Sequence, residues 1–135
     1  MREILFRGKR TDNGEWVYGD LIRDCICNTT VQYIGYYLYG EVADTENDDV
    51  VSVIPETVGQ YTGLKDKNGK KIFEGDILDY FDTLYIVSWS DNLLTYIVTS
   101  ADEKKEYLFY LNKANMDCVY IVGNIHDNPE LLEVD

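Results

Sequence analysis

Apolar and polar residues alternate along most of this chain, with the period of two that is typical of β-strands. Two such segments, residues 3–7 and 15–22, flank the sequence Asp12-Asn13-Gly14. An Asn-Gly pair between alternating segments favours a tight turn. We therefore expect the first two segments to form a β-hairpin.

The middle of the chain repeats this arrangement. Residues rich in β-branched and aromatic types predict strands at 30–38 and 50–54, and Pro55 ends the second of these because it cannot donate to a strand ladder. Gly59 and Gly63 favour a bend or bulge. Asn68-Gly69 then predicts a tight reversal between the extended residues on either side of it.

Further strands are predicted at residues 77–81, 84–89 and 93–98, after the turn sequence Glu74-Gly75-Asp76. The last two of these flank Ser90-Asp91-Asn92 and are nearly all apolar or aromatic. We therefore expect this hairpin to lie in the core.

The last third of the chain is less regular. Ser100-Ala101-Asp102-Glu103 resembles a helix capping box, whereas residues 106–111 are aromatic enough for a strand, and we favour a charged turn followed by a strand. Residues 119–122 predict another strand, and Asp127-Asn128-Pro129 is typical of the start of a short helix. The sequence thus predicts one mostly β domain over residues 1–135, a small barrel-like or sandwich architecture of short antiparallel strands with a short C-terminal helix.

Composition and charge narrow the class of protein. The 135 residues carry 12 Lys and Arg against 25 Asp and Glu, a net charge of −13, which disfavours direct binding to nucleic acid. No stretch approaches the roughly 20 apolar residues of a membrane helix, and the first residues lack the apolar run of a signal peptide. Three cysteines, an odd number, fit a reducing compartment. We expect a cytoplasmic protein with free thiols and no membrane partner.

Segments within residues 6–19, 54–69, 72–77 and 123–132 resemble the YopX-like family of phage and prophage proteins, and they follow one another in order along nearly the whole chain. The resemblance implies an all-β, barrel-like fold, a phage or prophage origin and expression in the bacterial cytoplasm. It also allows a homo-oligomer. It implies no activity, so no catalytic residue is carried over. The matching positions, whose role the resemblance leaves open, are Trp16, Gly19, Gln60, Tyr61, Thr62, Gly63, Gly75, Asp76, Gly123, Asn124, Asn128 and Pro129.

Two candidate chemistries rest on few residues. Cys25 and Cys27 lie on one face of a strand and, with Cys118 and His126, make a Cys₃His zinc site conceivable. Structural zinc sites usually take their ligands in C-x₂-C pairs, which the chain lacks, so we expect no metal or other cofactor. His126 beside Asp127 suggests a general base, but neighbours on an extended chain point apart, and we expect a structural histidine and no catalytic residue.

Two further patterns fail as ligand sites. Residues 44–49 resemble the start of a calcium loop, but Asp49 stands where the loop needs glycine and Pro55 where it needs glutamate. A solvated acidic turn is the simpler interpretation. Four glycines that fit neither phosphate-binding motif are interpreted as turn residues: Gly59, Gly63, Gly69 and Gly75.

Tyrosines gather beside this acidic turn, and tyrosine suits both binding surfaces and half-buried sheet positions. We expect a protein that is not an enzyme, whose outward-facing carboxylates bind a macromolecular partner, an unknown host or phage protein. One specific form is an acidic decoy that occupies a host nucleic-acid-binding protein. The tyrosines are Tyr33, Tyr36, Tyr37 and Tyr39.

Two alternatives remain open. One is a nucleic-acid-binding β-barrel in which Arg7, Lys9 and Arg10 form one basic face with the hairpin at residues 65–71, which requires the two segments to be adjacent. The other is an enzyme that uses His126, which requires a cleft with a second ionisable group within hydrogen-bond reach. The basic residues of the hairpin are Lys65, Lys67, Lys70 and Lys71.

Overall fold

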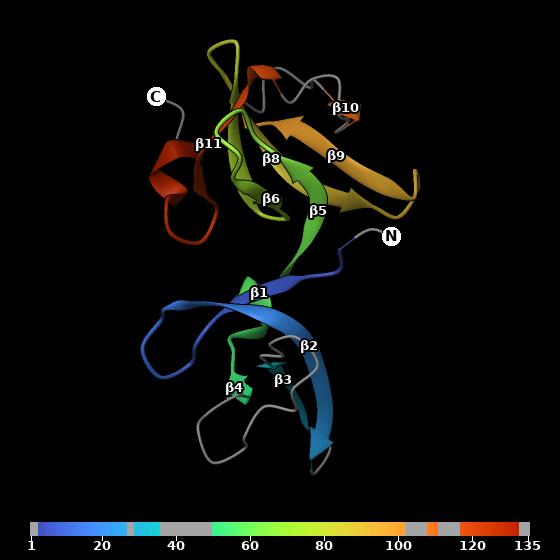
Figure 1. The fold of residues 1–135 in the computed structure, drawn as a ribbon, viewed down its shortest axis with the longest axis vertical. Coiled ribbons are helices and arrows are strands. Elements are labelled where there is room, and N and C mark those ends of the chain that lie inside the picture. Colours follow the sequence, from blue (N-terminus) through green and yellow to red (C-terminus); the bar gives the residue numbers. More distant parts are fainter. Residues whose placement is uncertain (1–2, 27–28, 36–49, 102–107, 111–116, 133–135) are drawn as a thin grey trace. The chain divides into compact units, whose positions relative to one another are not determined.

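The computed structural model describes residues 3–26, 29–35, 50–101, 108–110 and 117–132 (Figure 1). Its regular elements are β-strands and short 3₁₀ helices, which confirms the predicted mostly β fold class. The chain divides into two compact units, Met1–Tyr61 and Thr62–Asp135, and each is described by itself. This division describes how contacts are distributed and not whether either unit folds alone, so the single domain stays a prediction.

The first unit is an antiparallel sheet with the strand order β4-β3-β2-β1-β5. The predicted first hairpin is confirmed, although its strands begin and end later than the predicted 3–7 and 15–22. The elements of this unit are β1 (Phe6–Lys9), β2 (Trp16–Ile26), β3 (Thr29–Gly35), β4 (Val50–Ser52), the 3₁₀ helix η2 (Pro55–Thr57) and the first part of β5 (Gly59–Lys65).

Alternation along these strands places valines inside the first unit. Val17, Val51 and Val53 are buried, and partly buried apolar side chains pack against them. Each buried valine contributes on the order of 1.5–3 kcal/mol relative to exposure. The Thr57 hydroxyl donates a hydrogen bond to the carbonyl of Ile54 (2.6 Å) and accepts one from the backbone N–H of Lys9 (2.9 Å), which fastens η2 to β1.

The second unit contains the sheet β10-β9-β8-β7-β11, in which every neighbouring pair is antiparallel. The second part of β5 lies beside β6. The remaining elements are β6 (Lys71–Phe73), β7 (Asp76–Tyr80), β8 (Thr83–Ser90), β9 (Thr95–Ser100), β10 (Leu108–Tyr110), β11 (Val119–Asn124) and the 3₁₀ helix η4 (Pro129–Leu132).

Inward-facing residues from five strands form the core of the second unit. Leu64, Tyr80, Tyr96 and Ile121 pack against this core from its border. The sheet has outer strands, β10 and β11, so the described part does not decide between a barrel and a sandwich, and that finer choice stays a prediction. The buried members of the core are Ile72, Leu78, Tyr85, Val87, Val98 and Val119.

The prediction for the β8–β9 hairpin is wrong at its tip. β9 begins at Thr95 and not at Leu93, because Ser90 starts a four-residue turn: its carbonyl accepts the N–H of Leu94 (2.8 Å) and its hydroxyl accepts the N–H of Leu93 (3.1 Å). Leu93 and Leu94 are therefore exposed instead of lying in the core, and Trp89, within β8, is exposed as well.

Other predicted elements agree better with the structure. Gly63 has φ +90° within β5, as a bend requires, whereas Gly59 pairs in register with Arg7. β10 confirms a strand within residues 106–111, and the charged turn before it lies outside the described residues. The short C-terminal helix is confirmed as the single 3₁₀ turn η4, which begins at Pro129 as proline's fixed φ favours.

The expectation that carboxylates face outward is wrong for Asp66 and Asp76, which are 6% and 2% exposed. One oxygen of Asp66 accepts the backbone N–H groups of Asn68 and Lys70 (2.9 Å each), and the other accepts the N–H of Ile121 (3.0 Å). These charge-assisted bonds offset the cost of burying a carboxylate. The loop after β5 thereby covers the outer edge of β11.

We expect Asp66→Ala to lower the free energy of unfolding by about 2–4 kcal/mol, since three backbone donors lose their charged acceptor. Hydrogen exchange at the Ile121 amide is the measurement, and we expect faster exchange in Asp66→Ala, because that amide bonds to the carboxylate. Lys70→Ala is the control: it keeps the backbone N–H and removes only an exposed side chain, so its effect should stay within about 0.5 kcal/mol. Equal exchange rates in the two variants would contradict this account.

Candidate binding surface

The family-motif positions of the first unit lie at strand pairings. Phe6 stands opposite Gly19 on one side and Gln60 on the other. Tyr61 is buried, and its N–H donates to the carbonyl of Leu5 (2.8 Å). These contacts give the positions a structural role in joining β1, β2 and β5.

Trp16, another motif position, lies beside the basic residues of β1. The guanidinium carbon of Arg7 is 4.6 Å from the centroid of the Trp16 ring, and the Lys9 ammonium is 5.7 Å from it. Arg7 is buried, and Arg10 forms a bidentate pair with Asp12 (2.8 and 2.9 Å). That pairing holds the pKa of the Asp12 carboxyl below its usual value.

The lysines of residues 65–71 belong to the second unit, so the convergence of the two basic segments that the nucleic-acid-binding alternative requires stays untested. Within β5, the Thr62 hydroxyl donates to the carbonyl of Ile72 (2.8 Å) and accepts the N–H of Leu64 (3.2 Å). Thr62 therefore joins β5 to β6 immediately before the bend at Gly63.

Gly75 and Asp76 form the corner between β6 and β7. The Asp76 carboxylate accepts the N–H of Phe73 (2.7 Å). Gly75 has φ +89°, donates its N–H to the carbonyl of Val87, and accepts the N–H of Ile125 (2.9 Å each). A glycine is needed here because this left-handed backbone conformation is strained for other residues.

The side chains of Asn124 and Asn128 close the segment after β11 by accepting backbone N–H groups. The Asn128 side-chain oxygen accepts the Asn124 N–H (3.2 Å), and the Asn124 side-chain oxygen accepts the N–H groups of His126 (3.0 Å) and Asp127 (2.9 Å). A Cβ at Gly123 would lie 2.5 Å from the same Asn128 oxygen. Pro129 then opens η4.

The described contacts place His126 within this turn, where its ring lies close to Gly75. The expected structural role of His126 and the hypothesis of an enzyme that uses it both stay predictions. Among the described residues, no group of three or more His, Cys, Asp or Glu side chains is placed to hold a metal ion. Cys118 is exposed, while the side chains of Cys25, Cys27 and Tyr33, and residues 36–49 with the remaining tyrosines and the acidic turn, lie outside the described part.

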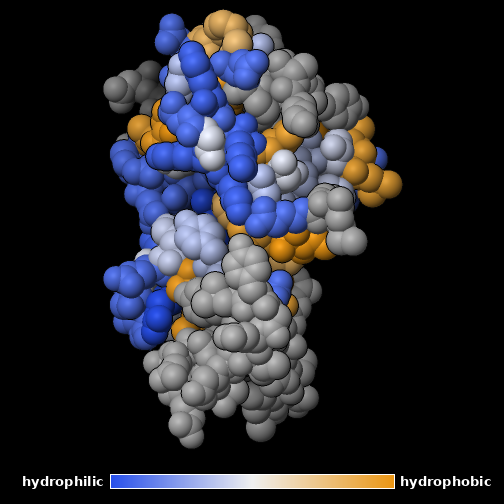
Figure 2. All heavy atoms as spheres, in the orientation of Figure 1, coloured by the Kyte–Doolittle hydropathy of each residue, from blue (hydrophilic) through white to orange (hydrophobic). Residues whose placement is uncertain are grey.

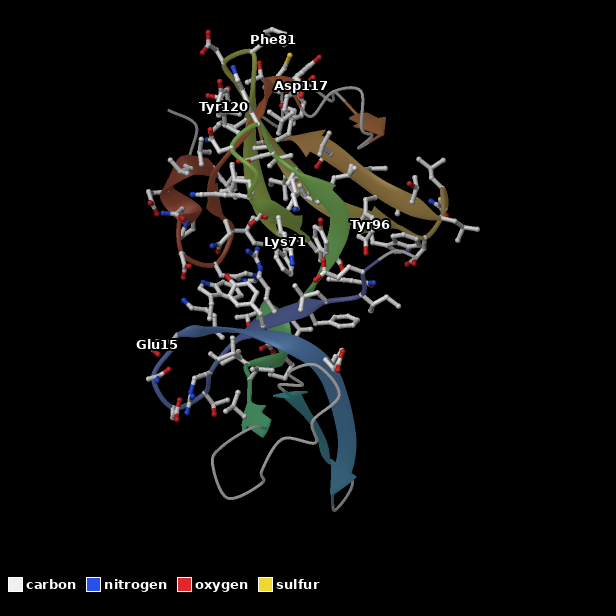
Figure 3. The ribbon with its side chains drawn as sticks, viewed as in Figure 1. Glu15, Lys71, Phe81, Tyr96, Asp117 and Tyr120 are labelled. Atoms are coloured by element: carbon white, nitrogen blue, oxygen red, sulfur yellow. The ribbon has the colours of Figure 1, made fainter. Side chains whose placement is uncertain are left out.

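A depression of about 370 Å³ lies at one end of the second unit, and the sequence did not predict it. The tip between β7 and β8 and the start of β11 contribute to it, where Figure 3 labels Phe81, Asp117 and Tyr120. The loop after β5 contributes Lys67. We call it the acidic-aromatic depression. Its lining residues are Lys67, Asp79, Phe81, Asp82, Asp117, Cys118 and Tyr120.

Phe81 is the most unusual residue of the depression. It was predicted to end a strand, but β7 ends at Tyr80, and Phe81 and Asp82 form a two-residue turn with φ of +50° and +64°. Such a turn matches the twist of the flanking strands, although asparagine and glycine usually occupy it. The N–H of Asp82 donates to the Asp79 carboxylate (3.0 Å), and Phe81 is 72% exposed with its ring edge-on to Tyr80. The only sequence signal was the two-residue gap between predicted strands.

Charge in the depression is mostly negative: three carboxylates, of Asp79, Asp82 and Asp117, face one ammonium group, that of Lys67. The Lys67 nitrogen lies 5.4 Å from the centroid of the Tyr120 ring, within the range of a cation–π interaction. Its hydrogen bond with the Tyr120 hydroxyl raises the pKa of Lys67. Figure 2 shows that hydrophilic side chains cover much of the visible face of this unit, with hydrophobic surface beside them.

Comparison with known proteins gives the chain its family. The sequence profile described as YopX protein matches residues 5–133. This chain belongs to the YopX family.

A solved structure is similar to this YopX-family chain along nearly its whole length. The crystal structure of protein EF1440 from Enterococcus faecalis is 27% identical to it with a TM-score of 0.55, over 98% of this chain and 100% of that one. Comparison with curated proteins gave no match. Among the described residues, no helix is long and apolar enough to cross a membrane.

We expect Gly123→Ala to destabilise this YopX-family chain by about 1–3 kcal/mol, because the added methyl group collides with the Asn128 side chain. In an Asn128→Ala background the same change should cost less, since the colliding oxygen is gone. Urea unfolding of the four proteins of this double-mutant cycle measures the coupling. Additive effects would show that the two residues do not collide.

The contact between Lys67 and Tyr120 predicts a pH effect. Because the pKa of Lys67 is raised, the contact stabilises the fold below the ordinary lysine pKa and is lost as the pH rises through the raised value. Tyr120→Phe should lower the pKa of Lys67 toward its ordinary value, as followed by NMR of the lysine side chain. Tyr96→Phe, a change outside the depression, should leave it unaltered, and an unshifted Lys67 in Tyr120→Phe would refute the assignment.

Proposed function

We propose that this YopX-family chain is a phage or prophage accessory protein that is not an enzyme and acts in the bacterial cytoplasm by binding a basic protein partner. The observation that supports the proposal most is the acidic-aromatic depression, in which exposed Phe81 and Tyr120 stand among three carboxylates. Aromatic residues are enriched at protein interfaces, where a ring provides a large contact area at small entropic cost.

Electrostatics favours a basic partner. The chain has a net charge of −13, and the depression repeats this imbalance locally. Complementary charge raises the rate of encounter and selects against acidic partners. A host nucleic-acid-binding protein presents the basic surface that such a chain would occupy, which keeps the acidic decoy as the specific form of the proposal.

The nucleic-acid-binding alternative has weaker support. Two of its three basic residues in the first unit are engaged within the protein: Arg7 is buried against Trp16, and Arg10 is paired with Asp12. Neither guanidinium group is therefore placed to contact a phosphate group. Binding of oligonucleotides at low salt would revive this alternative.

The test is affinity capture from host lysate with the tagged chain and two matched variants. Asp82→Asn/Asp117→Asn removes two charges from the depression, whereas Asp91→Asn/Glu130→Gln removes two exposed charges of the same unit outside it. We expect the wild type and the second variant to retain the same basic protein, identified by mass spectrometry, and the first variant to lose most of it. Retention should also fall between about 0.05 M and 0.5 M salt, because exposed charge pairs are screened.

Equal retention by both variants would contradict the placement of the partner at the depression. Retention of an acidic protein, or retention that does not respond to salt, would contradict the electrostatic basis of the proposal. Turnover of a small molecule by the purified chain would overturn its non-enzymatic character.

A further inference from the structure

We propose that the acidic-aromatic depression receives a single arginine side chain of the partner and that Lys67 occupies this cation site in the free protein. The inference rests on the proposed function and specifies its chemistry. It starts from a contact already present within the chain, the Lys67 ammonium 5.4 Å from the centroid of the Tyr120 ring.

The surroundings of this ring suit a cation. A positive group over an aromatic face gains electrostatic energy within about 6 Å, and nearby carboxylates add to the attraction. Asp79, Asp82 and Asp117 line the same depression. One exposed ammonium group, that of Lys67, leaves most of this negative charge uncompensated, so the depression can attract a second cation or exchange its own.

The edge of β11 argues for an inserted side chain and not for an added strand. The outward-facing N–H of Ile121 already donates to the Asp66 carboxylate, and the carbonyl of Val119 accepts the N–H of Lys67 (3.0 Å). An extended peptide that pairs with a sheet needs these groups unoccupied. A partner that approaches this part of β11 must therefore use its side chains.

Arginine fits better than lysine for reasons of shape and hydration. Its planar guanidinium stacks on aromatic rings, forks toward carboxylates and sheds water more readily than an ammonium group. The volume of about 370 Å³ lies at the small end of ligand sites, which suits one side chain and not a folded element. Phe81, 72% exposed, supplies a second apolar wall for the methylene groups.

An arginine can replace the Lys67 ammonium at the Tyr120 ring, because the Lys67 side chain is exposed while its backbone is fixed by the hydrogen bond to Val119. The ammonium can therefore swing away without disturbing the loop. An arginine that enters must compete with it for the Tyr120 ring. Removing the Lys67 side chain should consequently strengthen arginine binding.

The experiment is an NMR titration of the full chain with three probes: N-acetyl-arginine amide, N-acetyl-lysine amide and the neutral isostere N-acetyl-citrulline amide. We expect saturable amide shifts at the β7–β8 tip and the start of β11, with affinity in the order arginine, lysine, citrulline. Lys67→Ala should bind the arginine probe about two- to five-fold more tightly, the scale of one exposed cation–π contact.

Lys70→Ala is the matched control, because it removes the same charge from the same loop at a residue outside the depression. It should tighten binding clearly less than Lys67→Ala. Equal tightening in the two variants would show general electrostatics and overturn the site's occupation by Lys67. Shifts that are absent, or as large with citrulline as with arginine, would overturn the arginine site.

The two proposals fail separately. If arginine produces no shift while lysate capture still depends on Asp82 and Asp117, the proposed function stands and this inference falls. If arginine binds as expected but the lysate yields no charge-dependent partner, the cation site stands and the proposed function falls.

Discussion

The second unit depends on the hydrogen bonds that the Asp66 carboxylate accepts. The carboxylate sits at the end of β5, accepts three backbone N–H groups, and so fixes both the following loop and the edge of β11. Short antiparallel strands expose unpaired edge groups that invite pairing with other chains. A buried aspartate satisfies one of these groups at Ile121 and excludes an added strand there.

The acidic-aromatic depression follows from the same carboxylate. Because Asp66 holds the loop against β11, the exposed side chain of Lys67 lies beside Tyr120. The turn at Phe81 supplies the opposite wall through the register of β7 and β8, in which Tyr80 stands opposite Thr83. Three segments distant in sequence thus reach one place because hydrogen bonds to backbone N–H groups and the strand register position them.

Local turn chemistry is the part of this structure that the sequence predicted. Asn13-Gly14 and Asn68-Gly69 marked reversals because their backbone requirements can be recognised without tertiary contacts, and Gly14 and Gly69 indeed have positive φ. The burial of Asp66 and Asp76 could not be predicted in this way, since an aspartate beside a turn is usually solvated and only the distant partner Ile121 or the corner at Phe73 decides otherwise.

The motif positions and the depression show the same difference between local turn chemistry, which the sequence predicts, and tertiary contacts, which it does not. Gly123, Asn124 and Asn128, like most motif positions, are used by the backbone to close turns and corners. Membership of the YopX family therefore carries information about the fold. The lining of the depression depends on a register and an edge contact, and it lies outside the twelve predicted positions.

Backbone strain strengthens the case for the tip at Phe81. Among the described residues, positive φ is adopted mostly by glycine, yet Phe81 and Asp82 adopt it too, which costs on the order of 1–3 kcal/mol per residue. Leu94 is also strained and 74% exposed, so strain and exposure alone do not mark a site. What distinguishes Phe81 is that its ring borders a depression with carboxylates and with a cation already over the neighbouring Tyr120, whereas Leu94 lies outside that lining. Under the proposed function, the strain at Phe81 is offset by a contact between its ring and a partner, and a cationic side chain is the contact that its neighbours favour.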